Sequence, residues 1–148
     1  MIKIICVGKI KEKYLKDAIL EYQKRLSKYT KLEIIEVPDE ATGNILEKEK
    51  NSILKHINDK DYIITLEIEG NMISSIDFSK KIDNTLINYP NITFIIGGSY
   101  GLDDKIKSIS NYKLSFSKMT FPHQLFRILL LEQIYRAFKI LNNESYHK

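Results

Sequence analysis

The 148-residue sequence contains one cysteine, Cys6, and only three histidines, at positions 56, 123 and 147. A single cysteine excludes an internal disulfide, and the scattered histidines give no cluster with metal-ligand spacing. Cys6 lies inside a short β-branched run, where a cysteine is typically a small buried hydrophobe. We therefore expect no metal centre, and we interpret Cys6 as a core residue and not as a nucleophile.

Long apolar runs and targeting segments are also lacking. The apolar run at the start of the chain is too short for a signal peptide, and no small-residue cleavage site follows it. The most apolar stretch, residues 125–141, is interrupted by four charged residues, so it cannot sit in lipid as a span. We therefore expect a soluble, cytoplasmic protein that does not enter a membrane.

The usual signatures of nucleotide-binding and catalytic loops are missing as well. No G-K-[ST] sequence marks a P-loop, and no acid follows the glycines at 97–101 at the distance that a dinucleotide-binding fold requires. No G-x-S-x-G elbow occurs. Glu67 and Glu69 would share one face of a strand, but Gly70 beside them predicts a turn. We therefore favour a solvent-exposed strand end over a pair of catalytic carboxylates.

What the sequence does contain is typical of one globular domain. Hydrophobic residues make up 43% and charged residues 28%, close to the average of folded domains, and no repeat or low-complexity tract appears. A chain of this length can bury well over half of its unfolded surface in one core. We therefore treat residues 1–148 as a single domain.

Apolar β-branched runs alternate with segments of helical periodicity along the whole chain. This alternation predicts an α/β fold, with a mainly parallel sheet and helices on both faces. We expect strands at residues 2–7, 32–37, 62–68, 92–96 and 112–116. We expect helices over residues 15–29 and 44–58, from Ser74 or Ser75 to before Tyr89, from Asp103 or Asp104 for a short stretch, and from Pro122 to about Leu141.

The expected last helix is apolar around nearly its whole circumference. A helix of that kind has to be covered on more than one side. Because so small a chain offers little further cover, we expect the second cover to come from another subunit, in a two-fold homodimer.

The net charge of +4 conceals an uneven distribution. Residues 1–104 carry 15 Lys and Arg against 17 Asp and Glu, whereas residues 105–148 carry 8 against 2. No acid occurs between Asp104 and Glu132. A basic surface of this kind attracts phosphate backbones, although the same counts also fit an ordinary solvated lysine face.

Ligands of parallel α/β sheets bind beyond the carboxyl ends of the strands, and three stretches follow such ends here. They are LEIEG at 66–70, GGSYG at 97–101 and SFSKMTFPHQ at 115–124. Glycine either permits a turn with positive φ or leaves room for a ligand against the main chain. Taken alone, the glycine-rich stretch favours a structural turn over a ligand site.

Three stretches of the chain carry a family likeness: FIIGGSYG at 94–101, LSFSKMTFPHQLFRILLLEQIYRAFKI at 114–140 and the terminal YHK. They closely resemble the RlmH family, the SPOUT-class methyltransferases that modify pseudouridine at N3 in 23S rRNA of assembled ribosomes. The likeness runs from VGKIKEKY near the start to the final residue. The clearest difference from the family pattern is a short connection around residues 41–50, which contains none of these motifs.

The resemblance implies a fold and a cofactor. SPOUT domains thread the C-terminal part of the sheet into a trefoil knot, and S-adenosylmethionine (SAM) lies bent in that knot. By this similarity, Gly97 keeps side chains away from SAM, and Gly101 serves the turn into the next helix. The 116–121 stretch would offer backbone groups to the adenine edge. The implied cofactor-binding residues are Leu66, Gly97, Phe116, Ser117, Lys118, Met119, Thr120 and Phe121.

The resemblance also directs attention to the C-terminal tail. The imide N3 of pseudouridine is protonated at neutral pH, so a base, or cationic groups that favour the anion, would help its attack. Arg136, Tyr146 and His147 are the candidates for the substrate side of the site, across the dimer interface. A frayed C-terminus without a role is the alternative. His123 would orient the cofactor loop, meet RNA phosphate or be structural.

Two other functions stay open at this point. A ribosome-associated protein that binds RNA without catalysing a reaction would share the basic C-terminal half and its salt-sensitive binding. A flavodoxin-like nucleotide binder would share the alternation of strands and helices, but the acid expected after its glycines is missing.

Overall fold

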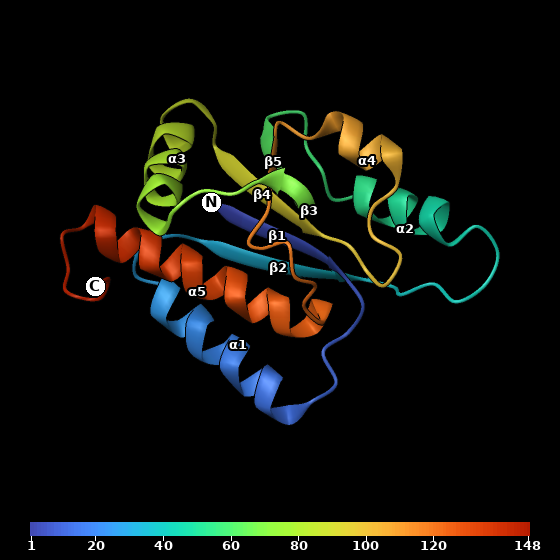
Figure 1. The fold of residues 1–148 in the computed structure, drawn as a ribbon, viewed down its shortest axis with the longest axis horizontal. Helices are drawn as coiled ribbons and strands as arrows, with labels where there is room; N and C mark the ends of the chain where they lie inside the picture. The colour runs from blue at the N-terminus through green and yellow to red at the C-terminus, as the bar shows by residue number, and fades with distance from the viewer.

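The computed structural model describes all residues, 1–148, and contains one five-stranded sheet in the order β2-β1-β4-β3-β5 (Figure 1). All neighbouring strands pair in parallel, which confirms the predicted α/β class. The strands are β1 (Ile2–Val7), β2 (Leu32–Val37), β3 (Asp61–Asn71), β4 (Asn91–Ile96) and β5 (Tyr112–Leu114). The helices are α1 (Lys13–Leu26), α2 (Ile45–Leu54), α3 (Ser75–Asn88), α4 (Asp104–Ile109) and α5 (His123–Leu141).

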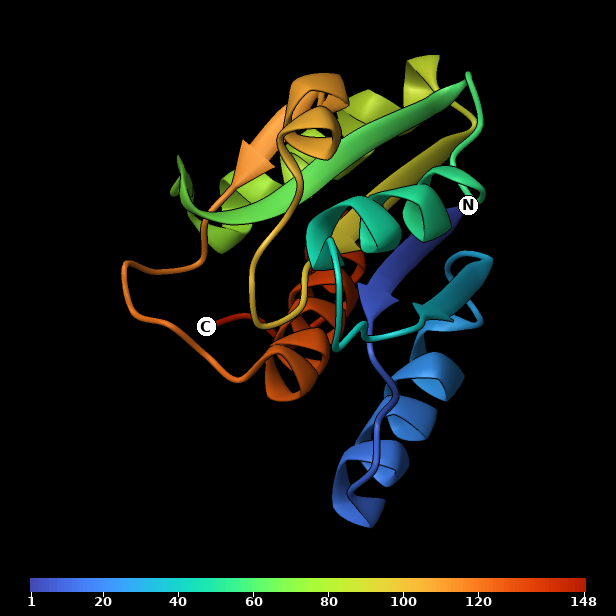
Figure 2. The same ribbon diagram turned by 90° about the vertical axis from the view of Figure 1, so that its right-hand side faces the viewer.

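Helices cover both faces of the sheet, as predicted (Figures 1 and 2). α1, α3 and α5 pack on one face, over a core that includes Ile4 and Phe94. α2 and α4 cover the other face, where Ile53 and Ile106 join a smaller core. Because both faces are covered, β1 and β4 are buried except for the half-buried Asn91, and most of their residues are apolar.

Cys6 belongs to the larger core and has no exposed surface. Burial raises the pKa of the Cys6 thiol to about 12. A thiol with so high a pKa is protonated at neutral pH and does not act as a nucleophile, which confirms that Cys6 is a core residue.

A buried ion pair lies near the amino ends of β1 and β3. Lys3 Nζ lies 3.1 Å from Asp61 Oδ2, with the two side chains 4% and 0% exposed, and it also donates to the His56 carbonyl at 2.7 Å. Asp61 accepts further hydrogen bonds from the Asn58 N–H and from Asn91 Nδ2. The pair therefore joins two strands that are not neighbours in the sheet.

The third strand differs from its prediction. β3 runs three residues beyond the expected end and pairs with β5 through an irregularity in which both Leu66 and Asn71 oppose Leu114. Gly70 therefore lies in a strand, and the predicted turn there is wrong. A Cβ at Gly70 would lie 2.8 Å from the Lys113 carbonyl, so glycine is required by the close approach of the two backbones.

The last helix receives most of its cover from its own chain. α5 lies between α1 and α3, over the sheet (Figure 1), so two helices of its own chain share in the cover that was expected from another subunit. Leu125 is nevertheless 40% exposed, and Ile128 and Leu129 are half-buried. The homodimer and the trefoil knot stay predictions. No helix is long and apolar enough to cross a bilayer.

Candidate functional site

A recess opens at the carboxyl ends of β3 and β4, where the three strand-end stretches meet. Every residue predicted to bind the cofactor lines this recess except Lys118, whose side chain is exposed. Leu66 comes from β3, Gly97 follows β4, and residues 116–121 connect β5 to α5. These distant segments meet because β3 lies between β4 and β5 in the sheet.

Three phenylalanine rings form an apolar wall of the recess. The ring centroids of Phe116 and Phe126 are 4.8 Å apart, and those of Phe121 and Phe126 are 6.0 Å apart. Tilted rings at such separations pack favourably. Met119 is 75% exposed and lies at the rim. This wall suits a flat, partly apolar ligand.

The 116–121 segment also presents free backbone groups. Ser115 Oγ donates to the Ser117 carbonyl at 3.1 Å, and the Met119 N–H donates to Ser117 Oγ at 3.0 Å. The N–H groups of Phe116 and Thr120 have no hydrogen-bond partner within the chain. Since backbone N–H groups are strong donors that seek partners, the segment can hydrogen-bond to the polar edge of a ligand.

Contacts within the chain explain why the positions beside the recess are occupied by glycine. A Cβ at Gly97 would lie 2.5 Å from the carbonyl oxygen of Gly101. A Cβ at Gly98 would lie 2.9 Å from Val7 Cγ1. Gly101 has a φ of +78° and no neighbour within 4 Å of an added Cβ, so it is a turn residue. The bare backbone at Gly97 is thus required by the loop itself.

A second hollow adjoins the recess along Leu114, Ser115 and Phe116, which line both. The recess has a volume of about 160 Å³ and the hollow about 190 Å³. Each is smaller than the ~300–1,000 Å³ usual for small-molecule sites. A ligand of nucleoside size would therefore extend from one into the other. Ser75 and Gln133 line the hollow on its far side.

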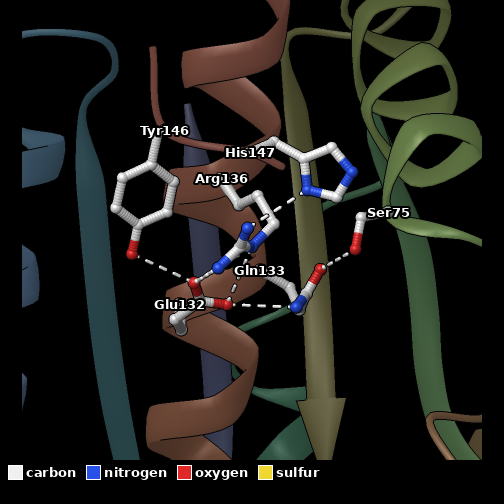
Figure 3. A network of polar contacts seen from close by, with 6 residues as sticks. All are labelled: Ser75, Glu132, Gln133, Arg136, Tyr146 and His147. Carbon is white, nitrogen blue, oxygen red and sulfur yellow. Dashed lines mark hydrogen bonds and ion pairs between the residues drawn. The ribbon is translucent and has the colours of Figure 1, made fainter.

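The three predicted substrate-side residues come together around Glu132 (Figure 3). Glu132 Oε1 accepts from Arg136 Nη2 at 2.6 Å and from the Tyr146 hydroxyl at 3.1 Å. Arg136 Nη1 lies 3.1 Å from His147 Nδ1, and the guanidinium stands 4.7 Å from the centre of the Tyr146 ring. The tail is therefore held against α5, and the alternative of a frayed C-terminus is not what the structure shows.

The same network reaches the second hollow. Gln133 Nε2 donates to Glu132 Oε2 at 3.0 Å, and Ser75 Oγ donates to Gln133 Oε1 at 2.7 Å (Figure 3). Gln133 thus contacts the network on one side and lines the hollow on the other. Polar groups of α3, α5 and the tail form one connected array.

The hydrogen bonds fix what each network side chain can do. A guanidinium only donates, so His147 Nδ1 accepts from Arg136 and the ring proton lies on Nε2. Hydrogen bonding to Glu132 raises the pKa of Arg136, which stays a cation. Burial, and then the bond to Glu132, raises the pKa of Tyr146, which stays a neutral phenol. The network therefore offers two kinds of donor to a developing anion: the Arg136 guanidinium, whose charge is partly balanced by Glu132, and the His147 Nε2–H.

Comparison with known proteins places the chain in a family. The family described as "Predicted SPOUT methyltransferase" matches residues 1–147. The putative ribosomal RNA large subunit methyltransferase H of Methanococcus maripaludis strain C5 is 58% identical over 157 aligned positions, which cover 99% of each chain. The chain belongs to the RlmH family of SPOUT methyltransferases. Ribosomal RNA large subunit methyltransferase H of Clostridium botulinum strain Okra is 59% identical over the same share of both chains.

Solved structures support the SPOUT fold. A probable methylase family protein from Haemophilus influenzae Rd KW20 aligns with a TM-score of 0.61 at 14% identity, over 99% of this chain and 70% of that one. The SpoU methyltransferase AviRb from Streptomyces viridochromogenes aligns with a TM-score of 0.50 at 10% identity, over 98% and 62% of the two chains. At such identities the likeness concerns the fold alone.

Some residues of this SPOUT site escaped the sequence analysis. Glu67 is half-buried, lines the recess and accepts a hydrogen bond from Thr65 Oγ1 at 2.6 Å. Its interpretation as a solvent-exposed strand end is therefore wrong, whereas Glu69 is exposed. His123, for which a role beside the cofactor loop was one of three predictions, lines the recess, and its Nδ1 is buried without a partner. The sequence could have pointed to Glu132 as the partner of Arg136, because the two are four residues apart, the spacing of an ion pair on a helix.

Proposed function

We propose that this protein transfers a methyl group from SAM to N3 of a pseudouridine in 23S rRNA of the large subunit in assembled ribosomes. The proposal is supported above all by full-length identity near 58% to proteins named ribosomal RNA large subunit methyltransferase H. The recess and the donor network around Glu132 contain groups suited to that reaction. A ribosomal substrate also implies a cytoplasmic location.

The chemistry of the recess supports SAM as its ligand. Its phenylalanine wall fits the adenine ring, and the free N–H groups of Phe116 and Thr120 fit the polar edge of that ring. The Glu67 carboxylate can accept from ribose hydroxyls. SAM supplies an already activated methyl group, so the protein has chiefly to align the nucleophile and exclude water. Leu66, Gly97 and the 116–121 segment would hold it.

Arg136 and His147 would act on the target base. Loss of the N3 proton places negative charge on the imide oxygens, and the Arg136 cation and the His147 Nε2–H are donors for that charge. Tyr146 and Glu132 hold the guanidinium in place. In this tautomer His147 is a donor at Nε2, so the geometry favours anion stabilisation over general-base catalysis by that ring.

The complete site would combine two copies of the chain. Phe126 in the recess and Arg136 are ten residues apart on α5, or about 15 Å at 1.5 Å per residue. In a two-fold pair of antiparallel α5 helices, the start of one helix lies beside the end of the other. The exposed Leu125 and half-buried Leu129 lie on the outer face of α5 that would form such a contact.

The experiment that tests the function is transfer of labelled methyl from SAM to intact ribosomes, compared with free 23S rRNA. We expect incorporation into ribosomes, and a rise in the melting temperature when SAM is present, because a ligand at 100 times its Kd adds about 2.7 kcal/mol of stability. A higher melting temperature with SAM but no methyl incorporation would indicate a protein that binds SAM without transferring its methyl group. If neither effect is observed, both the site and the function are rejected.

Replacing Gly97 by Ala should lower SAM affinity at least tenfold. The added Cβ would lie 2.5 Å from the Gly101 carbonyl oxygen, so the loop has to move, at a cost of about 1–3 kcal/mol. Gly43→Ala is the matched control, since Gly43 has a φ of +75° and lies far along the chain, in the β2–α2 connection. Calorimetry should show weakened SAM binding for the first variant alone; equal affinities would show that the loop does not shape the recess.

A further inference from the structure

The β1–α1 connection, residues 8–12, lies beside the cofactor recess and has no role in the site described above. Gly8 follows β1 with a φ of +94°, and a Cβ there would lie 3.5 Å from His123 Cε1. His123 lines the recess. The connection is therefore in contact with a wall of the recess, at the same carboxyl edge of the sheet.

The connection and α1 form a strongly basic segment. Residues 9–31 carry eight Lys and Arg against three Asp and Glu, a net charge of +5. Residues 32–104 carry six against fourteen, a net charge of −8. α1 projects from the body of the molecule at one end (Figure 2), so its charges are presented to large partners.

Three lysines of this segment are free to bind an anion. Lys9, Lys11 and Lys16 are exposed and have no ion-pair partner in the chain. Lys13, in contrast, pairs with Asp17 at 2.7 Å. Tyr14 lies between Lys11 and Lys16 in the sequence, with 69% of its surface exposed. An exposed aromatic ring between free lysines is a typical surface for contact with nucleic acid.

The backbone of the connection is held in place by a buried arginine. Arg127 is 1% exposed, donates to the Gly8 carbonyl at 3.1 Å and pairs with Glu36 at 2.6 Å. Glu36 in turn accepts from the Ile10 N–H at 2.9 Å. The arginine thus neutralises Glu36, and the two side chains together fix the backbone on both sides of Lys9. A contact surface built on a fixed backbone loses less conformational entropy when it binds.

A polar hollow separates these lysines from the start of α5. Its volume is about 460 Å³, and its lining includes Lys9, Lys11, Gln124 and one acid, Asp39, that has no arginine beside it. The first turn of α5 contains no acid, and its N-cap, Pro122, offers no side-chain acceptor. The positive end of the α5 dipole therefore adds to the lysine charges.

We propose that Lys9 and Lys11, with Lys16 and Tyr14 beside them, bind the phosphate backbone of the RNA that carries the target base. This proposal rests on the proposed function, because it assumes an RNA substrate at the adjacent recess. The contact would position the RNA without reading its base sequence, since phosphates carry no sequence information. It would hold the flanking backbone while the target base enters the recess.

The test compares two double variants in binding to purified ribosomes without SAM. Lys9→Ala/Lys11→Ala should weaken binding about tenfold and reduce the slope of log K against log salt by about 1.4–1.8, the loss of two phosphate contacts. Lys55→Ala/Lys60→Ala is the matched control. Both control lysines are exposed and lie between α2 and the start of β3, at the opposite edge of the sheet. SAM affinity, measured by calorimetry, should be the same in all variants.

The outcomes separate this inference from the function on which it rests. A salt slope that is the same for wild type and Lys9→Ala/Lys11→Ala overturns the inference, even where methyl transfer is intact. An equal loss in the control pair also overturns it, because the effect is then one of net charge. A selective loss in a protein that transfers no methyl supports the RNA contact and rejects the function. Tyr14→Ala should weaken binding without changing the salt slope, since stacking releases no counterions.

Discussion

Replacing Arg136 by Ala should slow methyl transfer to ribosomes by about 100-fold or more, the usual loss when a donor to a developing anion is removed. SAM affinity should be unchanged, because Arg136 does not line the recess. The variant also releases His147, whose Nδ1 accepts from Arg136 at 3.1 Å. Single-turnover rates and calorimetry on the same preparation measure the two quantities separately.

A matched control exists on α1. Arg25 and Glu21 form the same (i, i+4) pair as Arg136 and Glu132, with N–O distances of 3.4 and 2.6 Å. Arg25→Ala should leave the rate of methyl transfer within about twofold of wild type, since an exposed pair of this kind contributes about 0.3–0.5 kcal/mol to stability. Comparable losses in both variants would mean that Arg136 acts through the packing of its helix and not on the substrate.

Mixing two impaired variants, at a SAM concentration well below the Kd of the Gly97→Ala chain, tests whether the site combines two copies. An Arg136→Ala chain has an intact recess, and a Gly97→Ala chain has an intact Arg136. In a mixed dimer, one composite site then receives both intact parts. After exchange of subunits at equal amounts, roughly a quarter of the wild-type activity should return, because half of the dimers are mixed and each has one good site. If no activity is recovered, the recess and the Arg136 of one site belong to the same chain.

Replacing Asp61 by Ala should destabilise the fold by about 3–5 kcal/mol, since it leaves the Lys3 ammonium buried without its counter-charge. Lys3 and Asp61 are 3% and 5% exposed, so water does not replace the lost partner. Asp17→Ala removes an exposed partner of Lys13 and should leave the stability almost unchanged, since water screens such a pair. Urea unfolding followed by circular dichroism measures both values.

A second variant separates charge from packing at this site. Lys3→Met/Asp61→Leu removes both charges, and it should recover much of the stability lost in Asp61→Ala, because an apolar pair has no charge to desolvate. Further loss in the double variant would show that the other hydrogen bonds of Asp61, from Asn58 and Asn91, are what the fold requires.

The same pair makes stability depend on pH. Burial by itself raises the pKa of Asp61, but hydrogen bonds from Asn58, Asn91 and Lys3 outweigh it and lower the pKa below the usual value. A lowered pKa in the folded state means that the contribution of Asp61 is complete above about pH 4, the unfolded value. It is lost as the pH falls through the folded-state pKa. Wild type and Asp61→Ala should therefore converge in stability at low pH.

Much of the fold was accessible from local pattern. Periodicity located all five strands and all five helices, with β1 and β2 at their predicted bounds. Capping chemistry located the start of α3, where Ser74 Oγ accepts from the Asp77 N–H at 3.1 Å. The errors fell where a partner strand or helix decided the outcome. Gly70 is a strand residue because β5 passes close to it, a contact that no local pattern reveals.

The candidate site was accessible only in part. The three strand-end stretches followed from the rule for parallel sheets, and the family likeness singled out the residues within them. Neither disclosed that Glu67 faces the recess or that Glu132 holds Arg136 and Tyr146 together. Those roles depend on the direction of side chains from segments that are far apart in the sequence.

The sequence by itself determined the class of the fold, the positions of its elements, the burial of Cys6 and the family. Each of these rests on short-range patterns of polarity, turn residues and motifs. Only the tertiary structure decided why Gly97 is bare, which way the His147 ring donates, and where the lysines of residues 9–16 lie relative to the recess. The reason is physical: a steric clash, a hydrogen-bond direction and a local field each depend on atoms that the sheet brings together from distant parts of the chain.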